Sequence, residues 1–311
     1  MNLHLDYRRE PFAPAFMLRA LLPSPGLSPD GLPPLRIAWR GHRVRPKAFA
    51  RYLARTGLSA GAGAALLYPQ VLAFRMQMVA VTHPAYPLSI WQALQIRNHL
   101  LLHRPLVPGE VLNLETRLGG VRVLDKGVEI DVVSTAHAGP AAHAEPAAHA
   151  VPAGERVWEG LTTMYYRGRF GAPQAPSPLA QAPPVPDARL AGWTTPARGG
   201  LRFGLLTGDY NPIHWLGPYA RVFGFRRAFH HPQAVLGQCL ARLAPPAAPY
   251  PHRLDVWIKG PVYYGSAVEL RAAAEAEGSA FALIPLSDGR PALLGRWRAC
   301  APGSRLDAPP R

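Results

Sequence analysis

Two segments of the chain predict helices that are apolar on almost every side, and this feature limits the fold most. One begins at Tyr68 and runs to Val81, and the other begins at His231 and runs to Leu243. Each has a proline at its second residue, a position that the first turn of a helix tolerates. A helix without a polar face has to be buried all round, so another part of the chain must wrap around it.

Alternating apolar and polar residues downstream of each helix predict strands with one solvent-facing side. In the first half the alternation covers 128–132, and in the second half it covers 254–259. The predicted fold class is therefore α+β, with an antiparallel sheet curled around a central helix, formed twice.

A recurring turn supports an internal duplication. Pro105 and Pro261 are 156 residues apart, and so are Gly109 and Gly265, while the two prolines of the predicted helices are 163 residues apart. The constant offset within the turn favours two copies of one ancestral unit.

Proline-rich segments divide the chain into the two expected units. Residues 1–35 are predicted to be an irregular N-terminal arm, and 171–190 a linker that is too rich in proline for helix or strand. The first unit is then 36–170 and the second is 191–302.

A six-residue near-repeat at 137–154 contains three histidines, His137, His143 and His149. Its low complexity predicts a solvated loop. Neither a carboxylate nor a cysteine stands at ligand spacing beside the histidines, so a metal site is not expected there.

The net charge of +15 comes from 34 basic and 19 acidic side chains, and only three of the basic residues are lysines. The remaining 31 are arginines spread along a chain rich in alanine and proline, which indicates a bias of composition. No nucleic-acid-binding motif accompanies the charge, so nucleic acid is not an expected partner. A diffuse positive field favours an anionic ligand.

The cysteines and the N-terminus indicate the expected compartment. Cys239 and Cys300 are too few for a disulfide framework, and the first ten residues lack the apolar core of a signal peptide. No uninterrupted run of about 18 apolar residues predicts a membrane span. We expect a soluble protein of the cytoplasm with no membrane partner.

The segment 203–231 contains the residues with the clearest chemistry. Asp209 and His214 are separated by Pro212, which fixes a tight turn, so one loop can bring a carboxylate and an imidazole around a single water. Such a pair can move protons in both directions. The alternative is that Asp209 and Asn211 only cap a turn before a helix, and that His214 packs.

The run Gly208-Asp209-Tyr210-Asn211-Pro212-Ile213-His214, followed by Gly224-Phe225 and by His231 at a helix start, resembles the MaoC-like dehydratases, also called (R)-specific enoyl-thioester hydratases. The resemblance extends over roughly 36–300 and is densest at 203–243. It implies a double hotdog fold in which only the C-terminal hotdog is catalytic, because the N-terminal half lacks the run.

The resemblance also implies an activity: reversible hydration of a 2-enoyl thioester to a 3-hydroxyacyl thioester, without a metal or redox cofactor. Asp209 and His214 would share the catalytic water, and Asn211 would orient the pair by hydrogen bonding. His231 is a further candidate for an orienting or oxyanion role. The family has His-Gly at the helix start, where this chain has His231-Pro232. Proline has no N–H to polarise the thioester carbonyl, so we expect the amide of Gln233 to donate instead.

The expected substrate is an acyl-CoA or acyl-carrier-protein thioester, both of which are anionic. Arg226, Arg227 and Lys259 are candidate contacts for the carrier's phosphates, and the helix that begins at Tyr68 is a candidate wall of the acyl pocket. The carrier, the acyl chain and a homodimer are left open. The alternative function is a catalytically silent hotdog protein that binds acyl thioesters.

Overall fold

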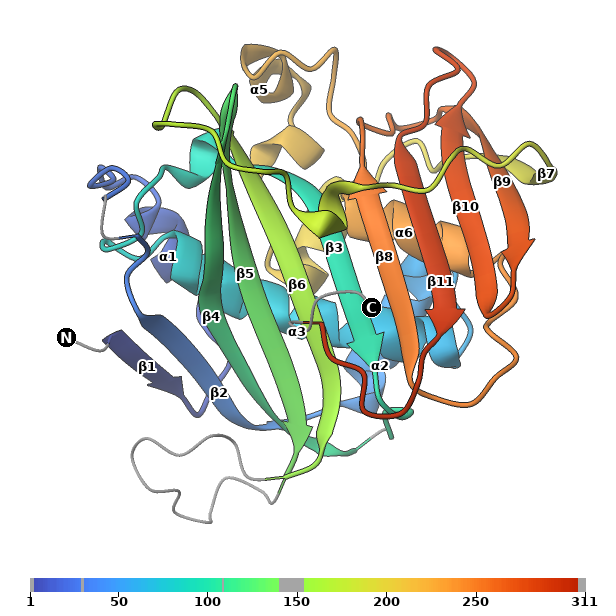
Figure 1. Ribbon diagram of the computed structural model, residues 1–311, viewed down its shortest axis with the longest axis horizontal. Coiled ribbons are helices and arrows are strands. Elements are labelled where there is room, and N and C mark those ends of the chain that lie inside the picture. The colour runs from blue at the N-terminus through green and yellow to red at the C-terminus, as the bar shows by residue number, and fades with distance from the viewer. Residues whose placement is uncertain (1–2, 29–30, 108, 140–153, 307–311) are drawn as a thin grey trace. The chain divides into compact units, whose positions relative to one another are not determined.

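The computed structural model describes residues 3–28, 31–107, 109–139 and 154–306 (Figure 1). The chain forms two compact units. The first unit consists of Met1–Pro46, Pro69–Gln181 and Arg305–Arg311, and the second of Lys47–Tyr68 and Ala182–Ser304. His143 and His149 of the predicted loop lie outside the described residues.

The first unit is built on a sheet with the strand order β1-β2-β4-β5-β6-β3. β1 and β2 are parallel, and the other described neighbours are antiparallel. The strands are β1 (Leu3–Tyr7), β2 (Leu35–Arg43), β3 (Leu94–Leu102), β4 (Val111–Leu124), β5 (Gly127–Ala138) and β6 (Arg156–Arg167).

Helix α3 (Ala62–Val81) supplies the core helix of the first unit from Pro69 onward, behind β4, β5 and β6 in Figure 1. Its two buried glutamines are bonded to the sheet: the Gln70 amide donates to Thr162 at 3.1 Å and the Gln77 amide to Ser134 at 3.2 Å. These bonds offset the cost of burying the amides. The unit also contains α1 (Ala13–Arg19) and the short helices η1 (Ile90–Gln92) and η2 (Pro178–Ala180).

The second unit is built on an antiparallel sheet with the strand order β8-β11-β10-β9-β7. The strands are β7 (Arg189–Thr194), β8 (His252–Ile258), β9 (Ala267–Glu275), β10 (Gly278–Pro285) and β11 (Leu293–Ala299). The helices are α2 (Pro46–Thr56), α4 (Gly200–Thr207), η3 (Pro212–His214), α5 (Gly217–Val222) and α6 (Pro232–Leu240).

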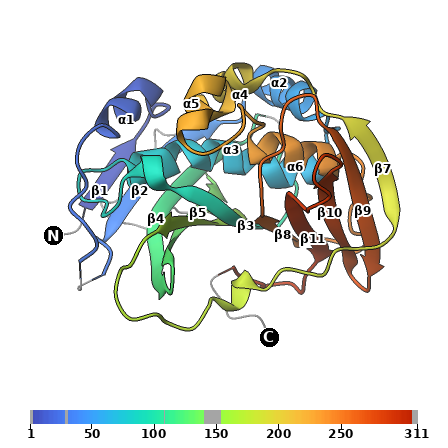
Figure 2. The ribbon, with the colours of Figure 1, turned by 90° about the horizontal axis from the view of Figure 1, so that it is seen from above.

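Helix α6 is the core helix of the second unit and lies behind β8, β11 and β10 in Figure 1. Val235, Leu236 and Cys239 on it are buried. The side-chain oxygen of its Gln238 accepts a hydrogen bond from the Trp193 indole of β7 at 2.8 Å. Seen from above, both core helices run along one side of their sheets (Figure 2).

The two units repeat one arrangement, as the duplication predicted. The order β2-β4-β5-β6-β3 in the first corresponds to β7-β9-β10-β11-β8 in the second. The recurring turn joins β3 to β4 in one unit and β8 to β9 in the other. The strands predicted at 128–132 and 254–259 both exist, but they are not equivalent: the first is β5, whose counterpart is β10, and the second is β8.

Three predicted boundaries differ from the structure. Residues 1–35 are not a separate arm, because β1 pairs with β2 and α1 buries Phe16. Residues 47–68, predicted in the first unit, belong to the second. Helix α3 begins at Ala62 and not beside Pro69, so this proline lies inside it. The burial of a long apolar helix compensates here for the backbone hydrogen bond that a proline removes.

The predicted linker contains η2 and otherwise no helix or strand before β7 begins at Arg189. Its two parts pack on different units. Leu179 lies against Leu101 and Leu161 of the first unit, and Ala182 lies against a cluster that includes Trp257 of the second. Apolar side chains thus fix both ends of a segment that its prolines keep extended.

One helix of the described residues, α3, has the length and apolar character needed to cross a membrane. In its most apolar window 94% of the residues are buried within the protein. These properties are those of a core helix.

Candidate active site

The loop between α4 and η3 is shaped by local sequence. Helix α4 ends at Thr207, and the next residue, Gly208, adopts a left-handed conformation (φ 85°) that favours glycine. Asn211 is the N-cap of η3: its side-chain oxygen accepts a hydrogen bond from the Ile213 N–H at 3.2 Å, and Pro212 follows at the first position. The loop therefore turns sharply twice between Gly208 and the end of η3.

The structure brings Asp209, His214 and His231 together in the second unit. Nε2 of His214 and Nε2 of His231 each lie 3.8 Å from Oδ2 of Asp209. The two imidazoles are stacked with centroids 3.9 Å apart, and both are buried. Asp209 keeps 19% of its side chain exposed, so the cluster opens at the carboxylate.

Backbone carbonyls fix the tautomers of both histidines. Nδ1 of His214 lies 3.1 Å from the Phe229 carbonyl oxygen, and Nε2 of His231 lies 3.1 Å from the Asp209 carbonyl oxygen. A carbonyl only accepts, so each of these nitrogens carries a proton when the ring is neutral. His214 then presents the lone pair of Nε2 to Asp209.

The Asp209 carboxylate is held at one oxygen and free at the other. Oδ1 accepts a hydrogen bond from the Asn211 N–H at 3.2 Å. Oδ2 faces His214 across 3.8 Å, which is too long for a direct hydrogen bond and suits two groups that share a water. Asn211 thus orients the carboxylate through its backbone and the loop through its side chain.

The chain is similar to known proteins in sequence and in fold. No protein-family model matches the sequence. A curated protein, 3-hydroxyacyl-thioester dehydratase X of Mycobacterium tuberculosis, is 26% identical over 215 residues, which are 69% of this chain and 71% of that protein.

Solved structures agree over most of the chain. A crystal structure of HtdX from Mycobacterium tuberculosis matches with a TM-score of 0.67 and 23% identity over 85% of this chain and all of that one. A MaoC-like dehydratase from Phytophthora capsici matches with a TM-score of 0.65 and 17% identity over 86% of this chain and 96% of that one. The chain has the double hotdog fold of the MaoC-like dehydratases. The predicted resemblance and fold class are confirmed.

Burial sets the protonation behaviour of the cluster in the C-terminal hotdog. It raises the pKa of the Asp209 carboxyl, and His214 and the Asn211 N–H partly offset this rise. Burial lowers the pKa of His214, which Asp209 and the bond to the Phe229 carbonyl partly offset. Burial and the neighbouring His214 hold the pKa of His231 well below its ordinary value. These directions favour neutral imidazoles, and they make the Asp209 carboxyl harder to ionise than an exposed one.

The cluster has a donor set that a divalent cation accepts, because one ligand atom from each of Asp209, His214 and His231 lies within 4.8 Å of the others. The proton of His231 Nε2 points at the Asp209 carbonyl, however, so that nitrogen offers no lone pair to a metal. The arrangement fits proton transfer better than metal binding.

Groups distant in sequence support the loop. Phe229, whose carbonyl holds His214, forms an antiparallel bridge with Tyr263, and the Tyr264 hydroxyl donates to the His214 carbonyl at 2.7 Å. In the sequence, the turn at 260–266 indicated only a duplication and neither of these two roles. No local pattern signals a contact between residues 50 positions apart.

The N-terminus of α6 lies next to the cluster, since His231 is its N-cap and Pro232 its first residue. The first hydrogen bonds of the helix run from Ala234 and Val235 to the His231 carbonyl. The N–H of Gln233 at the second position has no acceptor within the helix. Among the described residues, the side-chain oxygen and nitrogen of Gln233 are also buried without a hydrogen-bond partner. Such groups are available to a ligand.

The residues predicted to contact the substrate have different surroundings. The guanidinium groups of Arg226 and Arg227 lie 4.9 and 5.6 Å from the centre of the Tyr263 ring, which links them to the cluster through Phe229. Lys259 is exposed at the end of β8, and within the described ranges its side chain makes no hydrogen bond or ion pair. Tyr68 is buried, with ring contacts to Phe49 and Tyr52.

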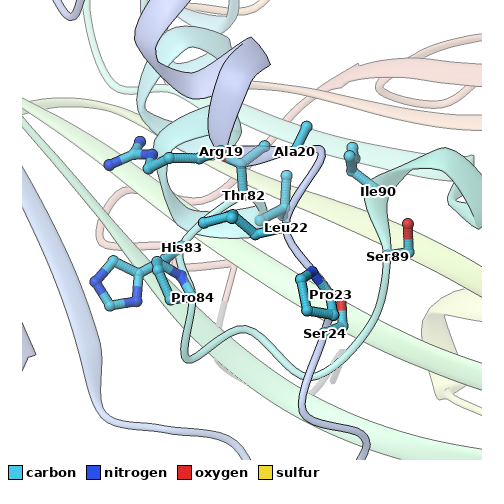
Figure 3. A pocket seen from close by; sticks show the side chains of 11 residues that line it. Arg19, Ala20, Leu22, Pro23, Ser24, Thr82, His83, Pro84, Ser89 and Ile90 are labelled. Atoms are coloured by element: carbon cyan, nitrogen blue, oxygen red, sulfur yellow. The ribbon is translucent and has the colours of Figure 1, made fainter.

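The segment that precedes the core helix α3 contains no counterpart of the Asp209 and His214 pair. Residues 57–61 connect α2 to α3 and include no ionisable side chain. A hollow in the N-terminal hotdog is lined by Arg19, Leu22, Thr82, His83 and neighbouring residues (Figure 3). None of the described residues that line it is a carboxylate, so it cannot supply an acid–base pair of this kind.

Proposed function

We propose that this protein is a hydro-lyase that adds water reversibly to a 2-enoyl thioester and forms a 3-hydroxyacyl thioester. The observation that carries this proposal is the free Oδ2 of Asp209 facing the lone pair of His214 Nε2 at 3.8 Å. The dehydratases that share its fold, one of them named for 3-hydroxyacyl thioesters, support the same reaction class.

The pair performs both proton transfers of the addition. One water bound between Oδ2 and Nε2 gives a proton to the pair as its oxygen bonds to C3 of the enoyl group. The electrons of the C2–C3 double bond move toward the thioester carbonyl, and C2 then takes a proton from the pair. Each transfer by a positioned group contributes about 10²-fold or more to the rate.

The negative charge that develops on the thioester oxygen needs a donor. In this proposal the Gln233 N–H supplies it, at the start of α6, where the helix dipole favours negative charge. The buried Gln233 side-chain amide lies on the same residue and gains a partner when the substrate binds.

The proline at the start of α6 gives a test of this donor. Pro232→Gly adds an N–H beside that of Gln233, so kcat is expected to stay similar or rise up to about tenfold, less than the effect of a sole oxyanion donor. Pro218→Gly, at the start of helix α5, is the matched control and should leave kcat unchanged. A fall in kcat of more than about tenfold in Pro232→Gly, with no such fall in Pro218→Gly, would argue that the thioester carbonyl of the substrate does not bind at the start of α6.

The pH dependence follows from the two pKa shifts. The active form has an ionised Asp209 and a neutral His214, so activity is lost as pH falls through either pKa. Burial raises the first pKa above the ordinary 3.8 and lowers the second below the ordinary 6.5. The higher of the two pKa values sets the acid limb of kcat/KM, so its midpoint is expected above pH 3.8. A midpoint at or below pH 3.8 in steady-state rates would contradict this protonation state.

The function itself is tested by absorbance assays of hydration with crotonyl, longer, branched and dicarboxylic 2-enoyl thioesters. Turnover of at least one, lost in Asp209→Asn, is the expected result. A protein that binds these thioesters in titrations but turns none of them over would be the silent binding protein suggested by His231-Pro232.

A further inference from the structure

Exposed apolar side chains gather on the helices beside the candidate active site. Six of the fifteen large apolar side chains exposed in the described part of the chain lie within 201–223. These six residues, together with Arg202 and Arg221, are called the α4–α5 surface. Its apolar members are Leu201, Leu205, Trp215, Leu216, Val222 and Phe223. Isolated exposed residues need no explanation, but a concentration of this kind marks an interaction site.

Helices α4 and α5 each bring exposed apolar side chains together. Leu201 and Leu205 are four residues apart on α4 and thus share one face of the helix. Helix α5 lies against η3, and the Phe223 ring packs at a tilt on the Tyr219 ring with centroids 4.8 Å apart. Val222 is 81% exposed and Leu205 is 60% exposed, so both are turned toward solvent.

The charge on this surface has one sign. Arg202 on α4 and Arg221 on α5 are exposed, and Arg226 and Arg227 follow directly. Between residues 198 and 231 the sequence contains one acidic residue, Asp209, which belongs to the candidate active site. An apolar patch with a basic rim is complementary to an acidic surface that carries apolar side chains.

The surface adjoins the residues that would act on the thioester. Helix α4 ends at Thr207, two residues before Asp209, and His214 is the last residue of η3. A molecule docked on the α4–α5 surface therefore sits beside the catalytic pair.

From these observations we infer that the α4–α5 surface docks an acidic acyl carrier protein, which delivers the enoyl group on its flexible phosphopantetheine arm. The inference rests on the proposed function and specifies its substrate carrier. A second copy of this chain is disfavoured as the occupant, because a two-fold interface would place the basic rim against itself. An anionic membrane shares the charge but presents no thioester.

The test compares one 2-enoyl group on two carriers, coenzyme A and a purified acyl carrier protein. In Arg202→Glu/Arg221→Glu the KM for the carrier-protein thioester is expected to rise about tenfold or more, with kcat unchanged, because like charges then meet across the interface. The kcat/KM for the CoA thioester should stay within about twofold. Val222→Asp should likewise raise the KM for the carrier-protein thioester and leave the kcat/KM for the CoA thioester unchanged.

Two matched variants control for charge and for surface polarity. Arg167→Glu/Arg169→Glu reverses the same number of exposed charges in the N-terminal hotdog, and Leu286→Asp places a carboxylate at another exposed apolar position. Both should leave the kinetics with either carrier unchanged. Raising the salt from about 50 to about 500 mM should weaken the parent protein's preference for the carrier protein.

Three results would overturn the inference. Equal losses with both carriers would show that the surface serves the active site only. Unchanged carrier-protein kinetics would exclude docking there, and would favour a membrane if the parent, but not the double variant, sediments with anionic vesicles. A double variant that changes the oligomeric state in light scattering, with unchanged carrier kinetics, would identify a second copy.

Failure of the proposed function is distinguishable from failure of the docking. If the parent turns over no enoyl thioester on either carrier, the hydro-lyase assignment is wrong. Docking is then decided by NMR titration of the labelled carrier protein: binding that the double variant loses supports the surface, and no binding by the parent refutes it.

Discussion

Replacing Asp209 by Asn is expected to lower kcat/KM for 2-enoyl thioester hydration by about 10³-fold, and His214→Gln by a similar factor. The double variant should lose scarcely more than either single one, since the two groups act on one water as a unit. The asparagine side chain of the first variant keeps an oxygen that can accept from the Asn211 N–H, so its fold should persist.

Steady-state rates and thermal melting measured on the same preparations check this expectation. Asp187→Asn, at an exposed carboxylate of the linker, is the matched control and should retain the parent's activity. Near-native turnover by either single variant, on a substrate that the parent uses, would remove the pair from the mechanism. Strictly additive losses in the double variant would show that the two side chains act on separate steps.

Gly200→Ala is expected to lower kcat/KM by about 10²-fold although Gly200 touches no substrate in the proposed mechanism. A Cβ at this position would overlap the His214 carbonyl oxygen and come within 2.5 Å of the Tyr264 hydroxyl. The methyl group must push α4 away from the loop, and a displacement of about 1 Å in a catalytic group is enough for such a loss. Overpacking should also cost about 1–3 kcal/mol of the free energy of unfolding.

The control for this prediction is Gly217→Ala at the start of α5. A Cβ there meets no atom within 4 Å, so activity and melting temperature should stay close to those of the parent. A crystal structure of Gly200→Ala would locate the displacement directly. Full activity in this variant would mean that the distance between α4 and η3 does not control the catalytic pair.

The internal duplication illustrates how far pattern reasoning extends. The turns at 104–110 and 260–266 were placed correctly as equivalents because a fixed offset survives in the residues that shape a turn. The strands at 128–132 and 254–259 were found, but alternation of apolar and polar residues marks a strand without indicating its neighbours. Hydrogen bonding between strands was needed to give β5 and β8 their different places in the two sheets.

The start of helix α3 was predicted wrongly, and for a different reason. A proline ordinarily belongs to the first turn, so the sequence predicted a start beside Pro69, whereas the helix begins at Ala62. Local propensity gave way to the burial of Leu66 and Leu67, which both lie in its first two turns. Residues 1–35 were predicted to be an irregular arm for a related reason. The pairing of β1 with β2 joins residues about 30 positions apart, and local sequence does not signal such a contact.

Patterns within short segments were enough to predict the fold class, the two-fold repeat and Asp209, Asn211 and His214 as candidate site residues. The folded chain was needed to establish which atoms of these residues are free. The Phe229 carbonyl sets the tautomer of His214, Tyr264 holds its backbone, and the Asp209 carbonyl occupies Nε2 of His231. These partners lie 15 to 50 positions away, and a contact at that separation exists only once the sheet has brought the segments together.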